Sequence, residues 1–168
     1  MEKPTFKSKW ANWKLIALVV ILIAVFIKFF VMGDGDENAP VTVEIDLGKV
    51  AMRSEQEVEA VLGKGKLDSY YKDDKAGCEK CPKMIYKEGK FEIIFINEIA
   101  DRIMINNLSD FDFEDRVILG LLDLKNNIKP VLDSDEVKRW DNYEKYSQIA
   151  AFAKDGKIEY ILIKAKTL

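Results

Sequence analysis

The segment SEQEVEAVLGK, residues 54–64, predicts a short amphipathic helix and defines the unit from which the fold is expected to be built. Ser54 and Glu57 form the capping-box pattern that begins a helix. Gly63 marks its end, because glycine is favoured just after the last helical turn. The apolar positions of the segment share one face of such a helix: Val58, Val61 and Leu62.

The same pattern recurs about 60 residues later. Asp112 is expected to cap a second helix, and its apolar face repeats the first at an offset of 60 residues: Ile118, Leu121 and Leu122. Residues 161–163 match residues 103–105 at an offset of 58, and Phe152 matches Phe95 at an offset of 57. A helix followed by three strands therefore appears twice, which indicates an internal duplication. The alternative is one domain with two ordinary runs of alternating strands.

The remaining elements follow from alternation and turn signals. Residues 41–47 alternate apolar and polar side chains, as a half-buried strand does, whereas residues 70–82 read as a loop. Asp155-Gly156 is a strong hairpin signal. Further strands are expected at residues 83–86, 91–96, 102–106, 137–140, 147–153 and 157–164.

The fold class expected is α+β, with two helix-plus-antiparallel-strand repeats that share one core. Repeat one covers about residues 41–108 and repeat two about residues 109–168. The repeats should share one core because neither has enough apolar surface to stand alone. Both helices should pack on one face of an antiparallel sheet. The predicted core consists of Val43, Ile45, Val58, Val61, Leu62, Ile93, Phe95, Ile103, Ile118, Leu121, Leu122, Phe152 and Leu162.

Residues 15–32 predict a transmembrane signal-anchor helix. The run is apolar except for Lys28, and as a helix it would span roughly 27 Å, close to the thickness of a hydrocarbon core. Lysines precede it in residues 1–14, so we expect that segment in the cytoplasm, residues 33–40 as a linker, and residues 41–168 as an extracytoplasmic domain. The alternative is a cleaved signal peptide and a secreted protein.

Composition limits the chemistry that this chain offers. It contains no histidine, which removes the usual general base and the usual metal ligand. Residues 41–168 carry 21 basic and 25 acidic residues, a net charge of −4, which argues against nucleic acid as a partner. No cofactor and no metal site are predicted.

Cys78-Glu79-Lys80-Cys81 is the most specific short motif. A zinc site is disfavoured, because the chain has no further cysteine and no histidine to complete four ligands. A thiol-redox pair prefers its first cysteine at a helix N-terminus, and the following residues look extended instead. A local disulfide of Cys78 and Cys81, formed in an oxidising compartment, is favoured.

Two aromatic-rich polar segments are candidates for protein binding, since tyrosine and tryptophan anchor many interfaces. Their members are Tyr70, Tyr71, Trp140, Tyr143 and Tyr146. The alternative is that these rings complete the core or cover a sheet edge.

Residues 50–54 and 57–64, followed by a hairpin, resemble the small envelope modules of the outer-membrane-assembly lipoprotein family of the SmpA/OmlA type. A tandem of such modules is similar to the beta-lactamase inhibitor protein fold. The resemblance covers about 55 residues per repeat. This chain lacks the lipid-modified cysteine of those lipoproteins and the proline common after their Leu-Gly-Lys. What the resemblance implies is extracytoplasmic protein binding without catalysis.

The sequence therefore predicts a single-pass cell-membrane protein whose extracytoplasmic module binds another protein and is not an enzyme. A homo-oligomer is a further expectation. The alternatives from other classes are a membrane-tethered thiol-disulfide oxidoreductase that uses Cys78 and Cys81, and a secreted inhibitor or immunity-type protein.

Overall fold

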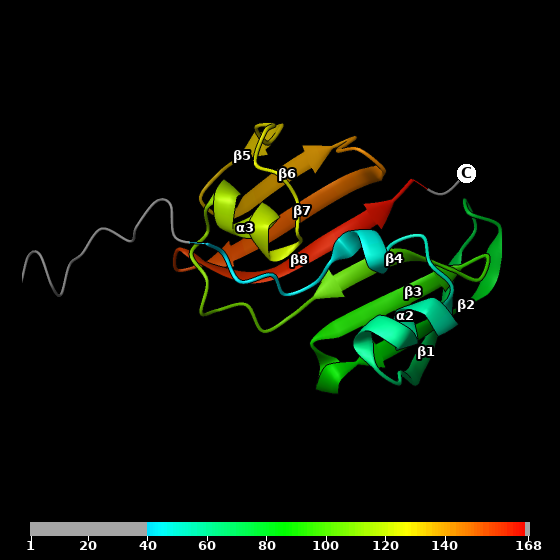
Figure 1. The fold of residues 1–168 in the computed structure, drawn as a ribbon. Helices are drawn as coiled ribbons and strands as arrows, with labels where there is room; N and C mark the ends of the chain where they lie inside the picture. The colour runs from blue at the N-terminus through cyan, green and yellow to red at the C-terminus, as the bar shows by residue number, and fades with distance from the viewer. Residues whose placement is uncertain (1–39, 167–168) are drawn as a thin grey trace, which may run out of the picture. The chain divides into compact units, whose positions relative to one another are not determined.

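One antiparallel sheet of eight strands dominates the computed structural model, which describes residues 40–166 (Figure 1). The strand order across the sheet is β1-β2-β3-β4-β8-β7-β6-β5. Each half of the chain thus contributes four strands that are neighbours in the sheet. The strands are β1 (Lys66–Asp73), β2 (Cys78–Tyr86), β3 (Phe91–Ile96), β4 (Ile99–Ile105), β5 (Leu132–Asp133), β6 (Val137–Asp141), β7 (Tyr146–Lys154) and β8 (Lys157–Ala165).

Tight turns set the pairing of the long strands. Asp155 and Gly156 both have positive φ, 54° and 74°, and they connect β7 to β8 through the end pair Lys154 and Lys157. This confirms the hairpin predicted from Asp-Gly, a dipeptide that tolerates the left-handed conformation such turns need.

The first helix, α2 (Glu55–Leu62), begins where the capping box predicted. The Ser54 amide donates to the Glu57 carboxylate at 3.0 Å, and the Glu57 amide donates to the Ser54 hydroxyl at 3.4 Å. Gly63 follows the helix with φ of 87°. These bonds satisfy backbone donors that the first turn otherwise leaves free, so the local sequence sets where this helix begins.

The second helix, α3 (Asp115–Leu121), begins later than expected. Its N-cap position is Glu114, which makes no side-chain capping bond. The predicted cap, Asp112, instead accepts a hydrogen bond from the Lys157 ammonium at 2.6 Å and forms an isolated bridge with that residue. A contact 45 residues away along the chain therefore overrides the local capping signal.

Residues 41–47 do not form the predicted strand. The amides of Glu44 and Ile45 both donate to the Leu121 carbonyl, at 2.9 and 3.1 Å, so the segment is fixed against the end of α3. Val43 is 48 % exposed, whereas Ile45 is buried. The 3-10 helix η1 (Leu47–Lys49) follows, and another, η2 (Lys87–Gly89), joins β2 to β3.

Gly120 lies where this N-terminal segment contacts α3. A Cβ added to Gly120 would stand 2.8 Å from the Cβ of Val41, closer than such atoms approach. We expect Gly120→Ala to lower the free energy of unfolding by about 1–3 kcal/mol, because overpacking outweighs the gain of about 1 kcal/mol in helix propensity. Urea denaturation checks this. A variant stabilised by the propensity gain would contradict the close packing.

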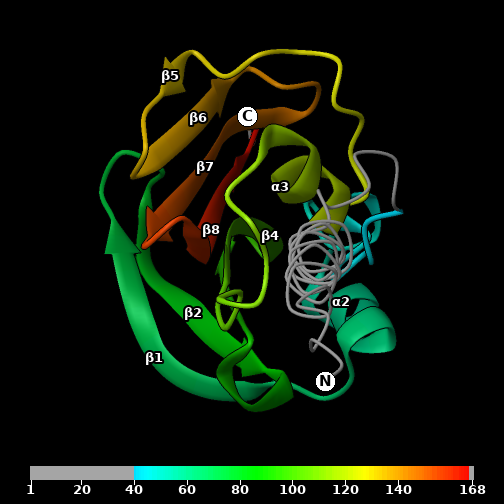
Figure 2. The same ribbon diagram turned by 90° about the vertical axis from the view of Figure 1, so that its left-hand side faces the viewer.

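The helices cover one face of the sheet, and the core lies between that face and the helices (Figure 2). Alternate residues of the central strands point into it, among them Ile93, Ile103 and Ile163. Most of the predicted core is confirmed: Ile45, Val58, Leu62, Ile93, Phe95, Ile103, Ile118, Leu121 and Leu122 are buried. The exceptions are Val43 and Val61, which are exposed, and Phe152 and Leu162, which are half-buried.

The buried tyrosines make the fold sensitive to alkali. Burial and the neighbouring Glu144 carboxylate raise the pKa of Tyr146 to about 12, and burial likewise raises the pKa of Tyr86 and Tyr143. Tyrosine in the unfolded chain ionises near pH 10, so these groups favour folding below pH 10 and lose that contribution as the pH rises towards 12.

We therefore expect the free energy of unfolding to fall above pH 10, and Tyr146 should contribute about 1.4 kcal/mol per pH unit to this fall between pH 10 and its folded-state pKa of about 12. Tyr146→Phe should flatten this slope by one tyrosine's share, which separates the effect from the deprotonation of lysines. Denaturant unfolding between pH 8 and 11 measures it. Equal slopes for the variant and the natural chain would contradict the assignment.

The structure corrects the expected fold class. Most of the regular secondary structure consists of strands, and the two α-helices contain only eight and seven residues. The segment expected to be a loop, residues 70–82, lies mostly in the β1–β2 hairpin, and β5 was not predicted. The fold is thus one eight-stranded sheet with two short helices, and not two repeats of a helix and three strands.

No helix within residues 40–166 is long and apolar enough to cross a membrane. The predicted anchor at residues 15–32, with the cytoplasmic segment 1–14 and the linker up to residue 39, lies outside the described residues. Residues 41–168 form one compact unit of their own.

The segments that the sequence matched at an offset of 58 residues are direct neighbours in the sheet. Strands β4 and β8 pair through Ile103 and Ile163, Met104 and Leu162, and Ile105 and Ile161. This pairing joins the two halves of the chain at the middle of the sheet.

Candidate functional site

A groove crosses the face of the sheet that the helices leave uncovered. In Figure 2 the helices lie on one side of the central strands, and the outer strands β1 and β6 curve away from them. The open face is therefore concave. The groove has a volume of about 360 Å³, and its floor is aliphatic: Ile94, Met104 and Leu162. Here "the groove" means this site.

Two rows of side chains across the sheet build the groove. Cross-strand partners form a mostly polar row from β2 to β8, and this row consists of Lys83, Ile94, Arg102 and Lys164. The next row on the same face is formed by Glu92, Met104 and Leu162. Because side chains alternate between faces, the residues beside these rows point into the core instead.

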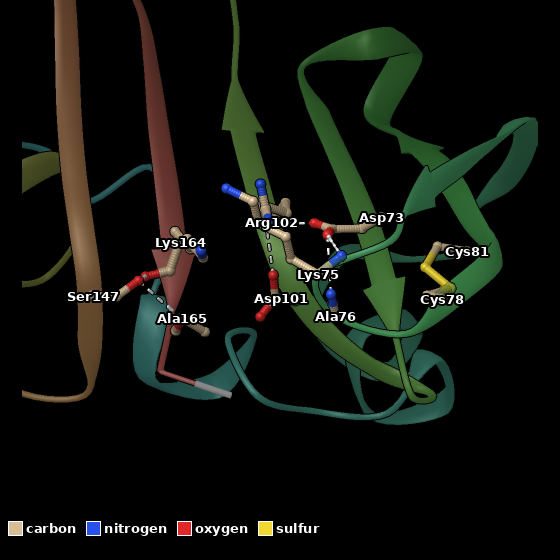
Figure 3. Close-up of polar contacts among 10 residues, drawn as sticks. All are labelled: Asp73, Lys75, Ala76, Cys78, Cys81, Asp101, Arg102, Ser147, Lys164 and Ala165. Atoms are coloured by element: carbon tan, nitrogen blue, oxygen red, sulfur yellow. Dashed lines mark hydrogen bonds and ion pairs between the residues drawn. A yellow bond between two sulfur atoms is a disulfide. The ribbon is translucent and has the colours of Figure 1, made fainter. Parts of the chain in front are cut away.

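Arg102 is held in place by two carboxylates (Figure 3). Its Nη2 donates to Asp73 at 2.7 Å, and its Nε donates to Asp101 at 2.9 Å. The other oxygen of Asp73 accepts from the backbone amides of Lys75 and Ala76, both at 3.0 Å. Asp73 therefore links the tip of the β1–β2 hairpin to the central strand β4.

The same contacts favour the ionised form of Asp73. The backbone amide of Ala76, followed by the charge of Arg102, holds the pKa of Asp73 below its ordinary value. The carboxylate thus stays ionised in mildly acidic solution, and Arg102 keeps its partner there. On the other side of the groove, Lys83 and Glu92 form an ion pair at 2.6 Å, which raises the pKa of Lys83.

This arrangement is suited to binding. An apolar floor within a charged rim is the usual layout of a protein interface, and ion-paired rim groups are already positioned before a partner arrives. Hydrogen bonds from Ser147 to the carbonyls of Lys164 and Ala165 fasten β7 to β8 beside the rim (Figure 3).

The structure separates the five aromatic candidates. Tyr70 and Tyr71 lie on β1 and are 52 % and 39 % exposed, and Tyr71 lines the groove. Trp140, Tyr143 and Tyr146 are each 1 % exposed and belong to the core. These three present no surface to a partner, so the expectation of a single aromatic binding group is corrected.

The buried rings use their polar tips internally. The indole Nε1 of Trp140 donates to the Ile128 carbonyl at 3.0 Å, and the Tyr143 hydroxyl donates to the Lys125 carbonyl at 2.5 Å. Both acceptors lie in the connection between α3 and β5. The aromatic residues therefore fasten this connection over the core, which was the alternative reading of the sequence.

Cys78 and Cys81 form a disulfide, as predicted, with their Cα atoms 5.9 Å apart. Both lie within strand β2 and not at the start of a helix, the position that lowers the thiolate pKa in many dithiol enzymes. In the register of the hairpin, Cys81 pairs with Tyr71 and Cys78 with Asp73. The disulfide thus lies on the strand next to Tyr71, which lines the groove, and Asp73, which binds Arg102.

Within residues 40–166, no group of three or more cysteine and carboxylate ligands is placed to hold an ion. A larger hollow of about 860 Å³ adjoins the start of α2 and the disulfide. Acidic side chains dominate its charged wall, namely Glu55, Glu59, Glu79 and Glu98, and they alone do not define a site.

Sequence reasoning missed Ile94, Arg102 and Met104 and placed Leu162 in the core. A signal for Ile94 and Leu162 existed in the runs IIFI at residues 93–96 and ILI at residues 161–163. A strand that is apolar at successive positions has apolar side chains on both faces, unlike one that alternates. Comparisons with protein-family models, with curated proteins and with solved structures find no match for this chain.

Proposed function

We propose that residues 41–168 are a protein-binding module without catalytic activity, and that the groove receives the partner. The observation that carries this proposal is the aliphatic floor of the groove, which lies open on a concave sheet face between fixed charges. Met104 and Leu162 lie at the centre of the sheet, where a fully covered sheet would bury such side chains. Among the described residues they are only half-buried.

The location is also a proposal. The disulfide supports an oxidising, extracytoplasmic compartment. Attachment to a cell membrane through residues 15–32, and secretion after cleavage as its alternative, stay predictions of the sequence.

A crosslinked pull-down from a native membrane fraction tests the function. The bait is the full chain with a C-terminal affinity tag, compared with the double variant Met104→Gln, Leu162→Gln. We expect the double variant to lose at least about tenfold in partner capture, since each glutamine places a polar amide on the apolar floor.

The matched control is Val61→Gln, an equally apolar-to-polar change at an exposed position of α2. It should capture the partner as the natural chain does. Capture that the groove variant retains in full would overturn the assignment of the groove, provided that both variants unfold at similar denaturant concentrations.

A second pair of variants separates binding from redox chemistry. Replacing Cys78 and Cys81 with serine should leave capture largely intact if the groove alone binds. Capture only by the cysteine form, through a bond that a reductant breaks, would instead favour the thiol-disulfide oxidoreductase.

A further inference from the structure

Strand β1 ends the sheet with an edge that no other strand of residues 40–166 covers. Three large apolar side chains lie on it in exposed positions, because Leu67, Tyr70 and Tyr71 are 43 %, 52 % and 39 % exposed. An exposed edge strand with large apolar side chains is a template for pairing with another strand. The opposite edge strand, β5, has only two residues and offers no comparable template.

The charges of this edge are complementary to themselves. Read along the chain, Lys66 and Asp68 precede Tyr70, and Lys72 and Asp74 follow it. When this stretch lies antiparallel to a second copy with Tyr70 opposite Tyr70, each lysine meets an aspartate. Asp68 then opposes Lys72, and Lys66 faces Asp74, the residue that follows the end of β1.

We propose that two copies of this chain dimerise through β1, in that antiparallel register, with Tyr70 on the two-fold axis. The two sheets become one continuous sheet across the axis. Because the same strand serves both copies, the contact closes as a dimer and leaves no free copy of the edge for a third chain. This surface is separate from the floor of the groove.

The middle of the strand is its most regular part, and the charged residues of the proposed pairing lie on either side of it. Register shifts in the β1–β2 pairing fall between Leu67 and Ser69 and between Tyr71 and Asp73, on either side of Tyr70. These irregularities bend the ends of the strand and leave Ser69–Tyr71 as its regular centre. In a single copy, Lys72 contacts Asp74 at 3.1 Å and Glu79 at 3.0 Å, through exposed pairs that contribute little and can rearrange.

Site-specific crosslinking of the full chain tests the register. Directly opposed residues of antiparallel strands lie within the span of a disulfide, so Tyr70→Cys should give a disulfide-linked dimer on mild oxidation. Leu67→Cys is the matched control, since it lies on the same strand with similar exposure. In the proposed register its two copies stand roughly 20 Å apart, six residues along the strand, and should not link.

We expect at least about tenfold more linked dimer for Tyr70→Cys than for Leu67→Cys, with peptide mapping that shows residue 70 joined to residue 70. Equal linking of the two variants would mean random collision, and no linking of Tyr70→Cys would mean that the edge is free or receives a different protein. Either result overturns the proposal.

Charge exchange gives an independent test in the Tyr70→Cys chain. Lys72→Asp sets two carboxylates against each other at each end of the paired strands, and Asp68→Lys sets two ammonium groups against each other. Each single change should reduce the linked dimer several-fold. The two changes together restore opposite charges and should restore linking. Failure of the double variant to recover, with its fold intact, would contradict the register.

Discussion

Trp140→Ala is expected to lower the free energy of unfolding by about 3–5 kcal/mol, one of the largest effects of any single substitution in this domain. Trp140 is 1 % exposed and lies on β6, where it pairs with Ile149 of β7. Its removal leaves a large cavity under the α3–β5 connection. It also strips the Ile128 carbonyl of the 3.0 Å hydrogen bond from the indole.

Two further variants serve as comparisons for this loss of stability. Trp140→Phe keeps a ring in the core but loses the indole donor, so we expect a smaller loss, about 1–3 kcal/mol. Tyr70→Ala removes an aromatic residue of similar size from the exposed edge and should change stability by about 0.5 kcal/mol or less. Urea denaturation measures all three, with backbone circular dichroism as the signal because the substitutions at Trp140 change the tryptophan fluorescence. Similar losses at positions 140 and 70 would contradict the division of the aromatic residues between core and surface.

Local signals predicted the parts of the fold whose causes are local. The capping box at Ser54 and the Asp155-Gly156 turn each act through atoms a few residues apart, and the structure confirms both. Asp112 was also expected to cap a helix, yet Lys157 of β8 binds it instead. Periodicity likewise predicted a strand at residues 41–47, but backbone amides of this segment donate to the Leu121 carbonyl at the end of α3.

The site was harder to predict than the fold because it depends on which face of each strand is covered. An apolar position in the sequence does not predict whether a helix of the same chain or a binding partner covers that face of the strand. Leu162 was assigned to the core for that reason, and the structure places it in the groove. Arg102 gave no sequence signal, because its partner Asp73 is 29 residues away in a stretch read as a loop.

Substitutions at two successive positions of β4 should separate folding from binding. Ile103 is 1 % exposed and points into the core, whereas Met104 is half-buried and points into the groove. We expect Ile103→Ala to lower the free energy of unfolding by about 2–5 kcal/mol, and Met104→Ala by about 1 kcal/mol or less, because less apolar area leaves the protein interior in the second case.

Partner capture should show the opposite order. Met104→Ala shortens the floor of the groove and should weaken capture by about tenfold, while Ile103→Ala should leave capture unchanged among molecules that remain folded. Chemical denaturation and the pull-down, on the same preparations, supply both readouts. If Ile103→Ala weakened capture as strongly as Met104→Ala under folded conditions, the two faces of β4 would not divide structure from function. If neither weakened it, the partner would bind outside the groove.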